Sequence, residues 1–251
     1  MLIDQFIQSF DRHPQLLTLD VDVCDDPAHG QQQLTLLHGY YGNHQYRPIV
    51  VTSTGNDAVL LIGLRHGTCG VALGAKDGLR NLTARLRAAW PESSAHVRGD
   101  DGFGVPGMHQ VLTELRLIFT FGLGMNPQVK ELTQALLEQA QAEYQRTGQP
   151  QRLFDRALTP SPNADSWPAP RQIVIEAEAN ALGTNHRAVA ANHPCWEVLP
   201  QCVFAAHAEL GEWENRNQEL KCDLQADRLS DHRFLANFLR SFLHVAALIL
   251  P

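Results

Sequence analysis

The segment from Leu16 to Cys24 constrains the fold most, because its side chains alternate strictly between apolar and polar. Such alternation is typical of a β-strand with one buried face, here carrying Leu17, Leu19, Val21 and Val23. Three further strand-like runs follow, separated by Gly, Asn and Pro. We expect them to form an antiparallel meander with the first strand; they are Leu34 to Gly42, Pro48 to Thr54 and Ala58 to Gly67.

Helices and strands then alternate along the chain. Helical spacing is found in three segments, and the third has Asn126 as a candidate N-cap, Pro127 at its first position and Gly148 as its stop. A short amphipathic helix is expected at the N-terminus. The expected helices are Asp77 to Trp90, Val105 to Leu115 and Asn126 to Thr147, and the expected strands are Ala95 to Asp100 and Leu117 to Gly124.

The segment from Gln149 to Pro170 is rich in Pro, Ser, Asn and Asp and is interpreted as a loop or insertion. A strand pair is expected after it, from Arg171 to Gly183 and from His186 to Asn192. The chain is then expected to be helical from Cys202 almost to its end. This order predicts an α/β fold with a mixed sheet flanked by helices, and in such sheets chemistry lies at the carboxyl ends of strands.

The stretch from Glu214 to Arg240 contains no Gly or Pro, and its apolar residues recur mostly at helical intervals. Glu214 and Lys221 are seven residues apart, so a helix would place them two turns apart on nearly one face. A carboxylate on a metal and an ammonium beside a phosphate would suit that arrangement. Taken alone, the pair is more typical of a solvated, salt-bridged helix face.

Composition excludes several classes of protein. The net charge of −7 argues against a strong attraction of the whole chain to nucleic acid or anionic membrane, although a local basic groove remains compatible with it. The five cysteines form no C-x-x-C pair, which argues against a disulfide framework or zinc knuckle and favours a reducing cytosol. No apolar run reaches the roughly 18 residues of a membrane span, and the N-terminus is not a signal peptide. Serine-hydrolase and Walker motifs are also missing.

Two aspartates lie at strand ends. Asp22 is on the polar face of the first strand, near its end, and Asp100 begins a glycine-rich turn after a later strand. Together with Glu214 they could form a cluster of three carboxylates, which requires divalent cations to offset the mutual repulsion. Oxygen ligands favour Mg²⁺ or Mn²⁺ over zinc. Each aspartate alone is more typical of a turn or cap.

Three motifs occur in an order that carries a family resemblance. They are VDVCDDPAHGQQQ with GYYGNHQYRPIVV, then VRGDDGF, then ENRNQELKCDLQADRLSDHRFLAN. The chain resembles, from about Leu17 to its C-terminus, the DDE transposases of bacterial insertion sequences, and more narrowly their group 1 DDE domain. The resemblance implies a single RNase H-like catalytic domain over residues 1–251, with an inserted β-rich segment at about 149–200.

The resemblance also implies a site and partners. Asp22, Asp100 and Glu214 would be the catalytic metal ligands for two Mg²⁺ or Mn²⁺ ions, and Lys221, with Arg228 as a weaker candidate, would contact DNA phosphate. Asp20 and Asp25 are alternatives for the first acid, and Asp101 is an alternative for the second. The expected partners are insertion-sequence ends, target DNA and a second copy of the chain, in the bacterial cytoplasm at the nucleoid.

Two departures from the family pattern leave an alternative open. Family members usually carry Tyr and Arg seven and four residues before the Glu, where this chain has His207 and Leu210. Neither side chain replaces a bidentate phosphate donor. The N-terminal region that recognises element ends is expected to be absent. A catalytically inactive, truncated remnant that binds DNA or an intact transposase is therefore the alternative, and a metal-dependent hydrolase of small phosphorylated substrates is a third possibility.

Overall fold

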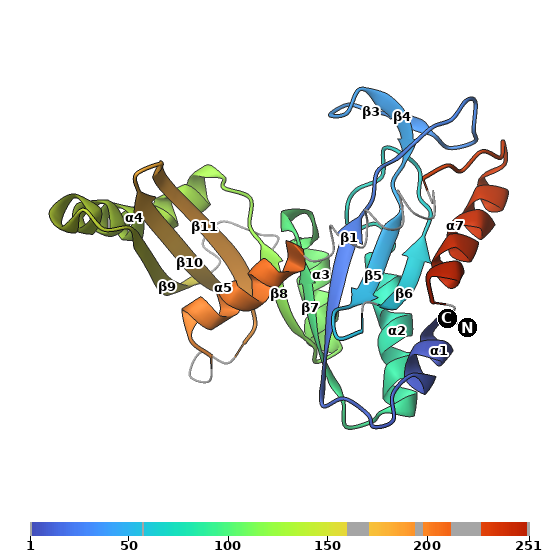
Figure 1. Ribbon diagram of the computed structural model, residues 1–251, viewed down its shortest axis with the longest axis horizontal. Helices are drawn as coiled ribbons and strands as arrows, with labels where there is room; N and C mark the ends of the chain where they lie inside the picture. Colours follow the sequence, from blue (N-terminus) through green and yellow to red (C-terminus); the bar gives the residue numbers. More distant parts are fainter. Residues whose placement is uncertain (1, 57, 160–170, 194–197, 212–226, 250–251) are drawn as a thin grey trace. The chain divides into compact units, whose positions relative to one another are not determined.

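The computed structural model of the chain describes residues 2–56, 58–159, 171–193, 198–211 and 227–249 (Figure 1). The chain forms two compact units. Unit 1 comprises Met1–Val97 with Gly211–Pro251, and unit 2 comprises Arg98–Leu210. Eight strands follow one hydrogen-bonded order, β6-β5-β1-β7-β8-β11-β10-β9, and the unit boundary falls within β7. In that order the strands are Ala58–Gly63, Ile49–Ser53, Leu16–Val23, Ser94–Gly99, Ile118–Gly122, Gly183–Ala191, Arg171–Asn180 and Gln151–Thr159.

In unit 1 the sheet begins as the expected meander. β1 pairs antiparallel with β5, with Asp22 opposite Val50, and β5 pairs antiparallel with β6. α2 (Ala75–Ala89) then connects β6 to β7, and α3 (Pro106–Glu114) connects β7 to β8. Helical crossovers of this kind join parallel strands, whereas hairpins join antiparallel ones. The prediction of a mixed α/β sheet flanked by helices is therefore confirmed.

Two terminal helices cover this part of the sheet. α1 (Leu2–Gln8) contacts β6 and α2, and α7 (Phe234–Ile249) contacts β6. Leu2 and Val245 share an apolar cluster with Val50 and Val59, so both ends of the chain pack on the same strands. The expected N-terminal amphipathic helix is confirmed. Burial of these apolar groups stabilises the docking by about 25 cal/mol for each Å² removed from water.

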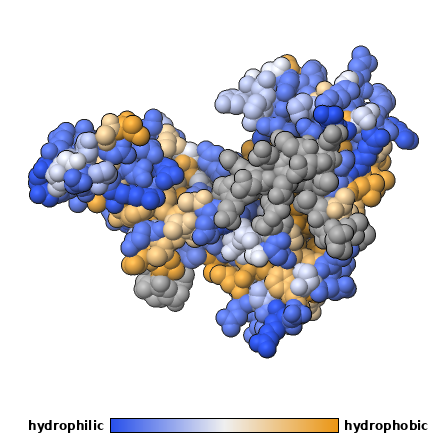
Figure 2. Space-filling model, viewed as in Figure 1, coloured by the Kyte–Doolittle hydropathy of each residue, from blue (hydrophilic) through white to orange (hydrophobic). Residues whose placement is uncertain are grey.

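The outer side of α7 remains apolar. Its exposed residues include Leu235, Leu239 and Leu243, and Figure 2 shows hydrophobic colouring over this helix at the right of the view. No helix in the described parts of the chain is long and apolar enough to cross a membrane.

The expected strand from Leu34 to Gly42 is only partly correct. Within it, only Leu36–His38 is a strand (β3), and it pairs with β4 (Asn43–Tyr46) rather than with the meander. β4 also pairs with β2 (Asp26–Pro27), which gives a separate sheet in the order β2-β4-β3. Apolar alternation cannot predict such a sheet, because its strands are short and largely polar.

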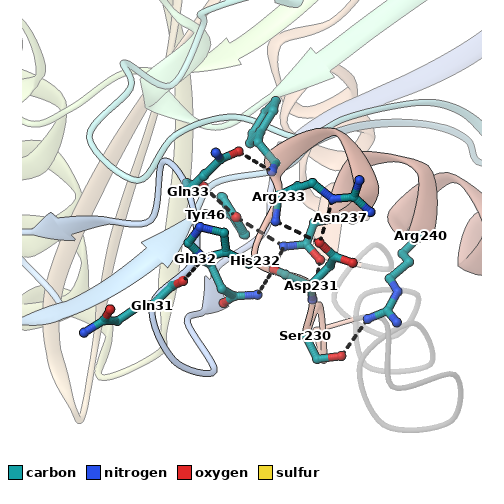
Figure 3. Close-up of polar contacts among 11 residues, drawn as sticks. Gln31, Gln32, Gln33, Tyr46, Ser230, Asp231, His232, Arg233, Asn237 and Arg240 are labelled. Atoms are coloured by element: carbon teal, nitrogen blue, oxygen red, sulfur yellow. Dashed lines mark hydrogen bonds and ion pairs between the residues drawn. The ribbon is translucent and has the colours of Figure 1, made fainter.

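The helix expected from Glu214 to Arg240 is wrong over residues 227–233, which are not helical, and residues 212–226 lie outside the described part of the chain. Residues 29–33 form a loop that donates hydrogen bonds to carbonyl oxygens of this non-helical segment (Figure 3). The Gln32 amide donates to the carbonyls of Leu229 and Asp231, and the backbone N–H of Gln33 donates to the His232 carbonyl at 2.9 Å. These hydrogen bonds satisfy the carbonyl groups of the segment without a helix.

The start of α7 is determined locally as well. The Asp231 carboxylate accepts the Arg233 N–H at 2.8 Å, and the Asn237 amide donates to the Asp231 carbonyl at 2.7 Å. Aspartate before a helix commonly satisfies its free N–H groups in this way. The sequence Ser230-Asp231 was therefore the signal that separates α7 from the preceding stretch.

In unit 2, α4 (Pro127–Thr147) has the predicted ends. The Asn126 side chain accepts the Val129 N–H at 2.9 Å, and Gly148 ends the helix in the left-handed conformation with φ of 64°. β10 and β11 form the expected strand pair, in which Glu176 lies opposite Arg187. The loop prediction is wrong at Gln151–Thr159, which is β9 and pairs antiparallel with β10.

The strands β9, β10 and β11 have a helix on each face (Figure 1). α4 packs on Ile173, Ile175 and Ala188. On the other face, α5 (Pro200–Ala208) packs through Val203 and Phe204 on Val174 and its neighbours. Side chains of a strand alternate between faces, so Glu176 lies on the α5 face. Figure 2 shows hydrophilic residues over the outer side of α4, at the left of the view.

Candidate active site

Asp22 lies one residue before the end of β1. Its side chain is half-buried, and its Oδ1 accepts the Val23 N–H at 2.6 Å. This position is at the carboxyl end of a central strand, next to β7 in the sheet order. The sequence prediction of a polar side chain at the strand end is therefore confirmed.

The alternatives for the first acid have different surroundings. Asp20 is only 2% exposed within β1. Asp25 accepts a hydrogen bond from the Gln45 amide at 3.3 Å. Hydrogen bonding to Asp25 raises the pKa of the Tyr41 hydroxyl, with the negative charge of Asp25 as the next cause. Asp25 is thus part of the contacts of the small sheet, and Asp22 is the more accessible carboxylate of β1.

Asp100 follows the last residue of β7 and begins the RGDDGFG turn. Its Oδ1 accepts the Gly102 N–H at 3.0 Å, so Asp100 caps the short 3₁₀ helix Asp101–Phe103. The side chain is exposed. A carboxylate oriented by a backbone N–H at the end of a strand can receive a cation from solvent.

Gly99, the last residue of β7, lies in a closely packed environment just before this turn. A Cβ on Gly99 would lie 3.1 Å from the rings of Phe103 and Phe121, and both rings are fully buried. The Asp101 side chain points elsewhere, since its Oδ2 lies 3.1 Å from the position of a Cβ on Gly124, after β8. Asp100 and Asp101 are thus adjacent in sequence but have different environments.

Glu214 and Lys221 lie outside the described residues. Arg228 is described; it is exposed and lies in the non-helical segment held by residues 29–33. Arg228 is therefore not on a helix, contrary to the sequence prediction. Asp22 is in unit 1 and Asp100 is in unit 2.

Arg98 has a structural role that the sequence analysis missed. Its side chain is 1% exposed, donates to the Ala206 carbonyl and pairs with Glu209 Oε2 at 3.1 Å. The arginine of the RGDDGF motif therefore binds the C-terminal end of α5, where a cation also interacts favourably with the helix dipole. Only Gly99 separates Arg98 from Asp100, so this contact anchors the turn that carries Asp100.

His207 and Leu210 are the residues that the family resemblance aligns with the usual Tyr and Arg before Glu214. His207 is half-buried on α5, and its buried Nδ1 has no hydrogen-bond partner within the described part of the chain. Burial lowers the pKa of His207 to about 4, with the positive charges of Arg98 and Arg187 as further causes. The imidazole is therefore neutral at pH 7. Leu210 is half-buried in the turn Glu209–Gly211.

The donor set suits a hard divalent cation in part. Asp22 and Asp100 offer carboxylate oxygens at strand ends, which is the ligand type that Mg²⁺ and Mn²⁺ prefer. Within the described ranges, no three His, Cys, Asp or Glu side chains gather closely enough to hold a metal ion. Glu214, the third expected ligand, is outside those ranges.

A pocket of about 560 Å³ lies in unit 1, and neither Asp22 nor Asp100 lines it. Its lining contains amide and imidazole groups but no Asp, Glu, Lys or Arg, and comprises Pro27, Ala28, Gly30, Gln31, Gln32, Gln33, Thr35, Asn43, His44 and His232. Chemistry that needs carboxylates cannot take place on this lining, so the strand ends are the better candidate.

Comparisons with known proteins place the chain in a family. No curated protein matches it. One similar solved structure is the piggyBac transposase synaptic complex with hairpin DNA, with 13% identity and a TM-score of 0.49 over 92% of this chain and 45% of that one. The chain thus spans less than half of that transposase. Another is Ciona intestinalis endonuclease V in complex with inosine-containing DNA, with 13% identity and a TM-score of 0.37 over 81% of this chain and 86% of that one. The model of the transposase DDE domain, group 1, matches residues 1–251, and the chain therefore belongs to that family.

Proposed function

We propose that this chain is the catalytic domain of a DNA transposase that cuts and rejoins insertion-sequence ends. The family match over the whole chain is the observation that carries the proposal. The positions of Asp22 and Asp100 at the ends of neighbouring strands support it. We further propose one RNase H-like domain over residues 1–251, in which β9, β10 and β11 belong to a segment inserted at about 149–200.

The proposed metal ligands are Asp22, Asp100 and Glu214, with two Mg²⁺ or Mn²⁺ ions. When bound, such ions would supply electrostatic stabilisation of charge on the attacking and leaving oxygens. The backbone N–H groups of Val23 and Gly102 orient the two described carboxylates. Lys221 and, more weakly, Arg228 would bind phosphates on either side of the cleaved bond.

The proposed reaction has two steps. In the first, a water oxygen bonds to phosphorus while the bond from phosphorus to the 3′-oxygen breaks, which leaves a 3′-hydroxyl and a 5′-phosphate. In the second, that 3′-hydroxyl attacks a phosphorus of target DNA and displaces its 3′-oxygen. No covalent bond to the protein forms. The substrates would be insertion-sequence ends and target DNA, and the active species would be a homodimer in the bacterial cytoplasm.

A second proposal is an inactive remnant that binds DNA or an intact transposase. The neutral, buried His207 and the apolar Leu210 favour it, because neither can bind a phosphate where the family usually has Tyr and Arg. The two proposals differ in cleavage and agree in DNA binding.

A nicking assay separates them. We expect the purified chain with Mn²⁺ to nick a plasmid that carries the DNA flanking its own gene. Asp22→Asn, Asp100→Asn and Glu214→Gln should abolish nicking, whereas Asp101→Asn, the matched neighbour of Asp100, should retain it. Equal nicking by wild type and Glu214→Gln would disprove the catalytic proposal and leave the remnant.

A further inference from the structure

The α5 face of β9, β10 and β11 carries two arginines joined by one buried glutamate. Arg152 on β9 donates from Nε to Glu176 Oε1 at 2.5 Å, and Arg187 on β11 donates from Nε to Glu176 Oε2 at 2.7 Å. The Nη2 atom of Arg152 also contacts Oε1, and the Nη2 atom of Arg187 also contacts Oε2. Both guanidinium groups are therefore held edge-on by a single carboxylate.

Exposure differs sharply within this cluster. The Glu176 side chain is 1% exposed, whereas those of Arg152 and Arg187 are 52% and 51% exposed. A guanidinium has five N–H donors, and the edge formed by Nε and Nη2 is committed to Glu176. The remaining donors of each arginine are directed away from that edge and can bind an oxyanion in a fork.

Further contacts fix the orientation of Arg152. Its guanidinium carbon lies 5.2 Å from the ring centroid of Phe154, which in turn packs 5.8 Å from the ring of Phe204 on α5. Glu178, 28% exposed, pairs with Arg152 Nε at 3.2 Å. Orientation before binding reduces the entropy lost when a ligand is captured.

We propose that Arg152 and Arg187 form a phosphate-binding pair for the DNA backbone, positioned by Glu176. The inference rests on the proposed function and adds to it a contact in unit 2. Arginine forks suit phosphate oxygens better than lysine does, and backbone contacts of this kind bind DNA without reading its sequence.

The position of Arg187 relates the pair to the candidate active site. Its positive charge is one cause of the lowered pKa of His207, so the guanidinium lies near the C-terminal half of α5. His207 and Leu210 precede Glu214 by seven and four residues, and Leu210 stands where the family usually has Arg. Arg187 thus carries a positive charge that acts on His207, three positions before Leu210.

Fluorescence anisotropy with a labelled DNA duplex over a range of salt concentrations tests the inference. Arg152→Gln and Arg187→Gln should each weaken binding about tenfold at low salt and reduce the slope of log affinity against log salt by about 1. Arg187→Lys should keep the slope and lose part of the affinity, because the charge stays and the fork is lost. Arg146→Gln is the matched control, since Arg146 is 71% exposed and ion-paired but lies on α4.

The outcomes are distinguishable. Both Gln variants could bind DNA with the affinity and salt slope of wild type and unfold at the same temperature. That result would show that the cluster is only a structural ion network. Equal losses in Arg146→Gln would also overturn the inference, because the effect would then be a general one of charge. If wild type itself fails to bind the duplex at low salt, both the proposed function and this inference fail. Binding with unchanged slopes overturns this inference alone.

Discussion

Both faces of the strands β9, β10 and β11 carry an apolar cluster, but they differ in the charged groups that lie beside it. On the α4 face, Ile173, Ile175 and Ala188 pack against apolar residues of the helix. On the α5 face, Glu176 is buried between two arginines, and the Nδ1 atom of His207 is buried with no hydrogen-bond partner among the residues that the structure describes. The first face stabilises the unit through dispersion and the hydrophobic effect, which respond little to pH and salt. The second face adds charged groups to an apolar cluster, and the contribution of those groups varies with pH and salt.

The largest effect is expected on the apolar face. Ile175 is 3% exposed, so Ile175→Ala removes buried methyl groups and leaves a cavity beneath α4. We expect a loss of about 3 to 4 kcal/mol in the free energy of unfolding, measured in urea. The loss should be the same at pH 5 and pH 7. If the loss in the free energy of unfolding differed between pH 5 and pH 7, the α4 face would not be independent of charge, and the proposed difference between the two faces would be wrong.

A smaller effect is expected at the carboxylate of the charged face. Glu176→Gln keeps the side-chain shape and removes the negative charge between Arg152 and Arg187. We expect a loss of about 2 to 3 kcal/mol, because charge-assisted hydrogen bonds are lost while the half-exposed arginines regain water. Urea unfolding at low and high salt measures it. A stability equal to that of wild type would show that the carboxylate is replaceable.

The smallest effect depends on pH. Burial lowers the pKa of His207 in the folded state to about 4, below its ordinary value of 6.5, so the unfolded chain binds the proton more readily. This stability is present above pH 6.5 and is lost as the pH falls from there toward 4. The change between pH 7 and pH 5 is about 2 kcal/mol.

His207→Leu should remove most of the decrease in the free energy of unfolding between pH 7 and pH 5, while the free energy of unfolding at pH 7 should stay nearly unchanged. Urea unfolding across pH 4 to 7 measures it. His193 serves as a comparison, because burial and Arg156 lower its pKa as well, and its contribution should persist in the variant. An unaltered profile in His207→Leu would assign the pH dependence to other groups.

The elements predicted correctly from the sequence have local causes. β1 follows from strict alternation, and α4 follows from Asn126, Pro127 and Gly148, each of which acts within a few residues of itself. Asp22 and Asp100 were placed at strand ends for the same reason, since alternation and turn glycines determine where those strands stop.

The wrong predictions have causes far away in the sequence. Residues 227–233 have helical spacing, but their carbonyl oxygens accept hydrogen bonds from residues 29–33, about two hundred positions earlier (Figure 3). β9 looked like a loop because polar residues interrupt its alternation. Its Arg152 is accommodated in the strand by the buried Glu176 of β10.

The sequence by itself determined β1, the two ends of α4 and the two aspartates at strand ends, because these depend on neighbouring residues. Only the tertiary structure decided which charges are buried together. Arg98 at the end of α5, and Glu176 between Arg152 and Arg187, are pairs of residues on different elements. A buried charge requires a partner of opposite charge. Which side chain becomes that partner depends on how strands and helices from distant parts of the sequence pack together.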